Sequence, residues 1–128
     1  MKEPIWISEE IVEVIHQDQI RQHGGGLGVR DKNLLAAGLA RPRHLLAYGQ
    51  PDLFDLAAAY GYGLAKNHPF IDGNKRTAFA VMATFLLVNG YLLEVPEMDV
   101  VQRMEQLATD RETQESLAQW LRKNSVFQ

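Results

Sequence analysis

The chain has 128 residues, of which 46% are hydrophobic and 23% charged, so residues 1–128 are expected to form a single globular domain with an ordinary core. The net charge of −3 provides no general basic field, which disfavours nucleic acid as a direct partner. The absence of cysteine excludes disulfides and thiolate zinc sites, and no apolar run approaches the ~20 residues of a membrane span, so we expect a soluble, cytoplasmic protein.

The N-terminal segment predicts a helix followed by a glycine-rich connector. Residues 5–7 fit a short extended entry, and Ser8 is suited to cap a helix with Ile11, Val14 and Ile15 on one face. That helix should end at residues 24–28, Gly-Gly-Gly-Leu-Gly. No Gly-Lys-Ser/Thr follows them and no strong strand precedes them, so a helix C-cap and connector is favoured over a nucleotide-binding loop.

The next segment predicts a short helix and a loop. Asp31 is suited to cap a helix that runs to about Leu39, and Pro42 is expected to mark its end. Residues 41–50 then read as a mobile loop.

Two long apolar segments predict the centre of the molecule. Residues 53–66 and 78–88 are apolar on nearly every side, as expected for buried helices, and Asn89-Gly90 supplies a stop after the second. Residues 91–95 fit a short extended segment, and the spacing of apolar residues predicts two more helices, around 100–107 and 117–121. The predicted fold is therefore an all-α bundle.

The joint between the two central helices carries the chemistry of the chain. It reads His68-Pro69-Phe70-Ile71-Asp72-Gly73-Asn74-Lys75-Arg76-Thr77. Because Pro69 disfavours helical geometry at the residue before it, the first helix should stop near Asn67 and leave His68 at a corner. A new helix should begin near Gly73 or Asn74, and the free backbone N–H groups at its start would receive an anion.

Lys75 and Arg76 oppose the local electrostatic rule. Cations near a helix N-terminus meet the positive end of the macrodipole, at a cost of roughly 0.3–1 kcal/mol each. A bound polyanion would remove that conflict, and such local conflicts tend to fall at functional sites. The simpler alternative is that Asp72 pairs with one of these cations, or caps the helix, and that the corner is only a solvated surface.

The remaining histidines receive no role. His16 and His23 lie seven residues apart, about 10 Å along a helix, which is too far to share one ion, and His44 is unassigned with them. Pro69 interrupts the helix between His68 and Asp72, so these two do not form a regular zinc-binding pair. Phe70 is expected to pack inward and Thr77 to cap or bond back to the helix.

Residues 68–76 resemble the His-x-Phe-x-Asp-Gly/Ala-Asn-Lys-Arg motif of the Doc (death on curing) branch of the Fic superfamily. The resemblance extends through the connector at residues 24–31 and the helix that ends at Asn89-Gly90, and it implies a compact all-α fold with the active-site loop between two central helices. It implies that His68 is the catalytic base, that Asp72 holds Mg²⁺, and that the ATP phosphates are bound by four consecutive residues, namely Gly73, Asn74, Lys75 and Arg76.

The motif departs from that of most Fic proteins, which transfer AMP and continue Gly-Asn-Gly-Arg-x-x-Arg. This chain has Lys75 in place of the second Gly and Phe79 in place of the last Arg. By resemblance the chain is a protein kinase that transfers the γ-phosphate of ATP to a threonine of elongation factor Tu and arrests translation.

The resemblance also implies a toxin of a type II toxin–antitoxin pair, neutralised by a Phd-like antitoxin. The Ser/Thr-x-x-x-Glu-Gly/Asn inhibitory motif of self-restrained Fic proteins does not occur in the sequence, so restraint by a second protein is expected. Two alternatives stay open. One is AMP transfer to a protein hydroxyl, and the other is a catalytically silent binding module, against which the presence of His68 and Asp72 argues.

Overall fold

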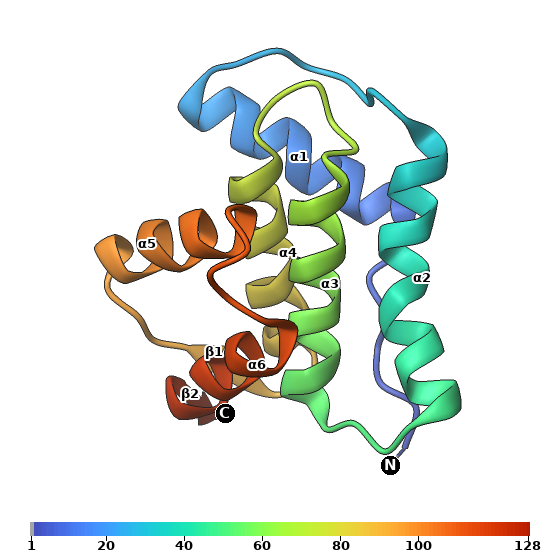
Figure 1. Cartoon of the computed structure of the whole chain (residues 1–128), viewed down its shortest axis with the longest axis vertical. Helices are drawn as coiled ribbons and strands as arrows, with labels where there is room; N and C mark the ends of the chain where they lie inside the picture. The colour runs from blue at the N-terminus through green and yellow to red at the C-terminus, as the bar shows by residue number, and fades with distance from the viewer. Residues whose placement is uncertain (1) are drawn as a thin grey trace.

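The computed structural model describes residues 2–128, which form six helices and a small two-stranded sheet. In chain order the elements are α1 (Glu9–His23), α2 (Lys32–Tyr48), α3 (Leu53–Asn67), α4 (Asn74–Val88), β1 (Tyr91–Leu93), α5 (Glu97–Ala108), α6 (Gln114–Lys123) and β2 (Ser125–Phe127). Figure 1 shows α3 and α4 at the centre, with α2 on one side and α5 and α6 on the other. The predicted all-α fold is confirmed.

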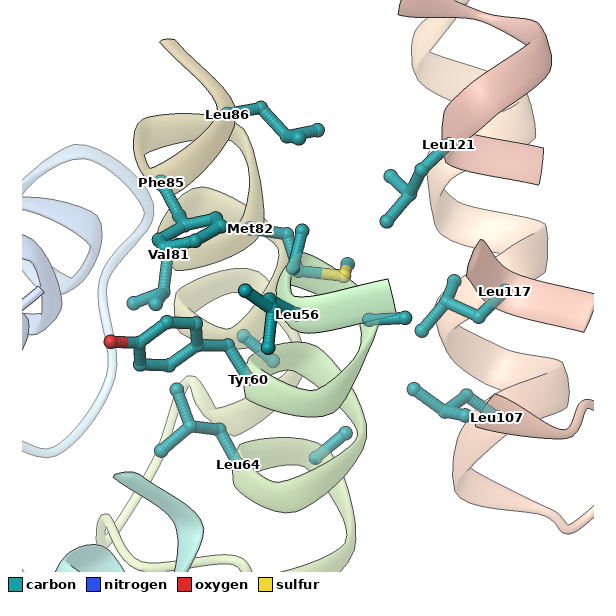
Figure 2. Close-up of a cluster of buried hydrophobic side chains, with 14 of the residues drawn as sticks. Leu56, Tyr60, Leu64, Val81, Met82, Phe85, Leu86, Leu107, Leu117 and Leu121 are labelled. Atoms are coloured by element: carbon teal, nitrogen blue, oxygen red, sulfur yellow. The ribbon is translucent and has the colours of Figure 1, made fainter. Parts of the chain in front are cut away.

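The core lies around α3 and α4, whose sequences are apolar on most sides. Figure 2 shows Leu56, Tyr60 and Leu64 of α3 facing side chains of α4, while leucines of α5 and α6 close the cluster from the other side. Burial of such side chains is the main favourable term in folding. The two helices that flank the candidate site are therefore the most firmly held elements of the molecule.

The second helix is longer than predicted. It runs through Pro42 to Tyr48, so the expected end at Leu39 and the expected loop at residues 41–50 were wrong. Pro42 has no N–H for the carbonyl of Gly38. That carbonyl faces α3 instead, since a Cβ added to Gly63 would lie 3.1 Å from its oxygen. The close packing of α2 on α3, with Pro42 buried, outweighs the local preference of proline.

The first helix is capped by Ser8 as predicted, because the Ser8 hydroxyl accepts a hydrogen bond from the Ile11 N–H. Its predicted face was wrong, since Ile11 and Val14 are exposed and only Ile15 packs against the core. The buried residues of this helix are Val12 and His16, one turn apart.

The extended segment after α4 is present as β1, which pairs antiparallel with β2, a strand that was not predicted. Residues 5–7 form no strand. The predicted helices near residues 100–107 and 117–121 are present as α5 and α6. Within residues 2–128, no helix combines the length and the apolar character needed to cross a membrane.

Candidate active site

The loop between α3 and α4 begins at His68, which ends α3 as its C-cap. His68 adopts the left-handed conformation, with φ 48° and ψ 55°, and its side chain is exposed. Left-handed geometry is uncommon for a residue with a side chain, and here Pro69 disfavours the ordinary helical alternative. The helix therefore stops at Asn67, as predicted, and the imidazole lies at its corner.

Arg30 holds this corner from the outside. Its guanidinium donates to the carbonyl oxygen of His68 at 2.9 and 2.6 Å and to that of Asn67 at 3.1 Å. These are carbonyls at the C-terminal end of a helix, where a cation is favoured by the dipole. This role of Arg30 was not predicted, because no local pattern indicates that it contacts a residue 38 positions later.

The glycine-rich segment pairs with the loop through the main chain. Val29 and Phe70 form an isolated antiparallel bridge. The Arg30 N–H donates to the Pro69 carbonyl at 2.7 Å, and the Ile71 N–H donates to the Gly28 carbonyl at 3.0 Å. Residues 24–31 are thus a C-cap and connector, as predicted, and they are also a backbone partner for the loop (Figure 1).

Phe70 and His16 fix the loop from the inside. Phe70 is buried, as predicted, and its ring stacks on His16 with centroids 3.9 Å apart and an angle of 6° between the planes. The His16 Nε2 lies 2.8 Å from the carbonyl oxygen of Asp72. His16 was unassigned in the sequence analysis. Its four-residue spacing from the buried Val12 is the sequence signal that would have turned it inward.

Asn74 braces the same loop with its side chain. Its Oδ1 accepts from the Phe70 N–H at 2.9 Å, and its Nδ2 donates to the Phe70 carbonyl at 3.0 Å. Both polar atoms of the amide are therefore engaged within the protein. Any contact of Asn74 with an anion would have to use its backbone N–H.

The start of α4 has no side-chain cap. Gly73 is its N-cap residue, with a left-handed φ of 73°, and a Cβ at this position would lie 3.0 Å from the Ile20 Cδ1. The first turn of α4 then contains Asn74, Lys75 and Arg76. Unpaired N–H groups, a glycine and cations together make the arrangement that binds phosphate in proteins.

Asp72 lies beside this helix start with its carboxylate exposed. Its Oδ2 accepts from the Gly26 N–H at 3.2 Å and its Oδ1 from the Gly73 N–H at 2.8 Å. These hydrogen bonds, the first from Gly26, hold the pKa of Asp72 below its ordinary value, with help from the charge of Arg76. The carboxylate is ionised at neutral pH, and each oxygen keeps a lone pair for a cation.

The two cations of α4 differ in their partners. Lys75 forms an ion pair with Glu105 of α5, whereas Arg76 forms no ion pair with any residue of the described range 2–128. Neither of them pairs with Asp72, and Asp72 is not the N-cap of α4, so both simpler alternatives for Asp72 were wrong. The Thr77 hydroxyl is buried without a hydrogen-bond partner, so its predicted capping or back-bonding was also wrong.

A cavity of about 870 Å³ brings the predicted site residues together. His68, Asp72 and residues 73–76 line it, together with His23 and Gln19 of α1. Phe79, Val100 and Met104 are among its apolar lining residues. The cavity therefore combines groups suited to phosphates with apolar side chains, most of them from α4 and α5.

A metal ion at Asp72 would need ligands from outside the protein. Within the range 2–128, no three His, Asp or Glu side chains lie close enough to hold one together. An exposed carboxylate is a suitable single ligand for Mg²⁺, which keeps several waters and binds substrate phosphates. The residues present thus fit Mg²⁺ that arrives with a nucleotide.

Comparison with known proteins gives the family. The model of the Fic/DOC family matches residues 6–86, which include α1, the connector and the whole loop. The chain is 52% identical over 73 residues to Toxin Doc of Mycolicibacterium smegmatis, a match that covers 55% of each chain, so it spans about half the length of that relative. It is 35% identical over 94 residues to Protein kinase doc of Escherichia phage P1, covering 72% of this chain and 75% of that one. With the all-α fold and the motif of residues 68–76 in place, the chain belongs to the Fic/DOC family.

Proposed function

We propose that this protein is a Doc-type toxin and a protein kinase that transfers the γ-phosphate of ATP to a hydroxyl side chain. The observation that carries the proposal is the uncapped start of α4, with Gly73, Lys75 and Arg76, on the same cavity as the exposed imidazole of His68. The names of the two relatives, a toxin and a protein kinase, support it. The threonine of elongation factor Tu is the proposed acceptor, on the resemblance alone.

The proposed roles follow from the chemistry of each group. His68 accepts the proton of the target hydroxyl while the hydroxyl oxygen forms a bond to the γ-phosphorus of ATP. The bond from that phosphorus to the bridging oxygen breaks, and ADP leaves. Lys75, Arg76 and the backbone N–H groups of α4 stabilise charge on the phosphoryl oxygens. Mg²⁺, when bound by Asp72 and the phosphates, supplies further charge neutralisation.

Lys75 and Phe79 favour a kinase over an AMP transferase. Lys75 adds bulk and charge one residue after Asn74, where AMP-transferring relatives have glycine, so there is less room for an α-phosphate in the nest. Phe79 lines the cavity where the second arginine of those relatives would be. The terminal phosphate is then expected to face the acceptor.

Labelled ATP separates the two reactions. The protein is incubated with elongation factor Tu, Mg²⁺ and ATP labelled at either the α- or the γ-phosphate. We expect only the γ label to reach the protein, with a mass gain of one phosphate, about 80 Da. Transfer of the α label would show AMP transfer instead, and no transfer of either label, with ATP binding retained, would favour a silent binding module.

We also propose an antitoxin of the Phd kind as the partner. A short, partly disordered protein that folds on binding could cover the cavity or the surface that meets the target. Co-expression with the product of a neighbouring short gene should abolish toxicity. Two results together would contradict the toxin assignment. Cells that express the chain alone would grow normally, and the purified protein would not modify the factor.

A further inference from the structure

We propose that His16 is a positioning residue that sets the orientation of the Asp72 carboxylate by fixing the peptide bond between Asp72 and Gly73. This inference rests on the proposed function, since it concerns the residue proposed to hold Mg²⁺. It gives a role in the reaction to a buried histidine outside the motif of residues 68–76.

The hydrogen bond to Asp72 determines the tautomer of His16. The His16 Nε2 lies 2.8 Å from the Asp72 carbonyl oxygen, and a carbonyl oxygen only accepts hydrogen bonds. Nε2 must therefore carry the hydrogen. The ring is 2% exposed, so water does not compete for this bond.

The position of the ring is fixed by packing. His16 stacks on Phe70, with the centroids 3.9 Å apart, and Phe70 is itself fully buried. The ring also lies against Gly73, since a Cβ on that residue would be in ordinary van der Waals contact with the His16 Nε2, at 3.9 Å. A donor held from α1 in this way cannot follow the loop if the loop shifts.

The planarity of the peptide bond carries this constraint to the carboxylate. The peptide that joins Asp72 to Gly73 has its oxygen on His16 and its N–H, on the opposite side, on the Asp72 Oδ1 at 2.8 Å. Because the two groups lie in one rigid plane, a rotation that breaks the first bond also turns the second. His16 thus acts on the carboxylate through the main chain, without touching the reacting atoms.

Two substitutions separate this role from a purely structural one. His16→Gln keeps a donor at the reach of Nε2, whereas His16→Leu keeps the bulk and removes the donor. Val12→Ala is the matched control, since Val12 is buried on the same helix one turn away and its side chain has no donor for the loop. All three variants are expected to lower the melting temperature.

The decisive measurement is binding of Mn²⁺, as a stand-in for Mg²⁺, in the presence of a non-hydrolysable ATP analogue. Loss of a partner outside the ligand shell commonly costs 10–100-fold in metal affinity, so we expect about tenfold weaker binding in His16→Leu. His16→Gln should recover most of it and Val12→Ala should bind as the natural protein does. Natural affinity in folded His16→Leu would overturn the proposal.

A second measurement needs no variant. The ¹⁵N shifts of the imidazole in the natural protein should show a protonated Nε2, with slow exchange of the Nε2 hydrogen. A ring protonated at Nδ1 and bare at Nε2 would overturn the proposal even if His16→Leu failed to fold. Failure of the proposed function looks different, because phosphate transfer would then be absent while both of these readouts kept their predicted values.

Discussion

The two central helices begin in opposite ways. Both α3 and α4 have 15 residues. At the start of α3, Asp52 and Asp55 form a capping box, and Arg122 of α6 pairs with both carboxylates, at 2.8 and 3.3 Å. At the start of α4 there is a left-handed glycine, no side-chain cap and two cations.

The start of α3 is built for stability, whereas the start of α4 is left open for the proposed ligand. The α3 start satisfies its own N–H groups with acidic side chains, which suits the helix dipole. The α4 start leaves its N–H groups free and adds charge of the unfavourable sign. Lys75 has a negative partner in Glu105, whereas the N–H groups of α4 and Arg76 are proposed to receive theirs from a ligand. The buried faces of both helices hold this uncapped end in place.

The largest expected effect lies at the corner where the two helices meet. His68→Ala should lower the transfer rate by a factor on the order of 10²–10⁴, because the general base is lost. The side chain is exposed, so the free energy of unfolding should change by less than about 1 kcal/mol. Steady-state kinetics and urea unfolding of the same preparation test both parts. A transfer rate equal to that of the natural protein would show that His68 is not the general base.

The next effect concerns Lys75. Lys75→Ala should raise the KM for ATP by roughly 10- to 100-fold, since a charge-assisted contact of about 1.5–3 kcal/mol with a phosphate is removed. Stability should hardly change, because the exposed pair with Glu105, about 0.2–1 kcal/mol, and the unfavourable dipole term are of similar size. Glu105→Gln is the control, as it removes the pair and leaves the cation. A matching rise in KM in that control would mean that the pair, and not the free charge, supports binding.

Removing the N-cap of α3 should lower stability and leave the kinetics unchanged, the opposite of what is expected for Lys75. Asp52→Ala should cost about 1 kcal/mol of unfolding free energy, the usual loss for an N-cap. The kcat and KM of the folded fraction should stay at natural values, since Asp52 does not line the cavity. Chemical denaturation and kinetics below the transition measure the two quantities. A marked loss of kcat would show that the starts of α3 and α4 are coupled, against the comparison.

The smallest effect is the pH dependence of that cap. Burial acts to raise the pKa of Asp52, but hydrogen bonds from the Asp55 N–H and Arg122 outweigh it, so the pKa lies below its ordinary value. A lowered pKa in the folded state means that the cap stabilises the protein above the unfolded pKa of about 3.9, and that this stability is lost as the pH falls through the folded pKa. Between about pH 5 and pH 2, the free energy of unfolding should therefore decrease less steeply with falling pH in Asp52→Ala than in the natural protein. Parallel curves of unfolding free energy against pH would contradict the lowered pKa of Asp52.

Sequence patterns predicted the elements whose local and global signals agree. Ser8, Asp31 and the apolar segments around residues 53–66 and 78–88 carry caps and burial patterns that act over a few residues, and the corresponding helices were found. The predicted end of α2 before Pro42 was wrong because the unfavourable effect of proline on a helix is local. The packing of Gly38 on Gly63 that offsets it depends on a helix far along the chain.

The candidate site was predicted as a stretch of sequence but not as an assembly. His68, Asp72 and residues 73–76 line one cavity, which their closeness along the chain made accessible to prediction. His16, Arg30 and the Gly28 carbonyl hold the loop from 38 to 56 residues away, through contacts that no local pattern encodes. The role of the Asn74 side chain, which closes the loop on Phe70, was not predicted.

The pairing of residues 24–31 with the loop has a consequence for local opening. We call this line of main-chain hydrogen bonds the seam. Across it, the Arg30 and Asp31 N–H groups donate to the Pro69 carbonyl, and the Ile71 N–H donates to the Gly28 carbonyl. Groups that share such a seam open and close as one unit, so their amide hydrogens should exchange with solvent at a common rate rather than helix by helix. The loop between α3 and α4, which is proposed to carry the chemistry, would then lose its shape whenever the connector detaches, even with both central helices intact.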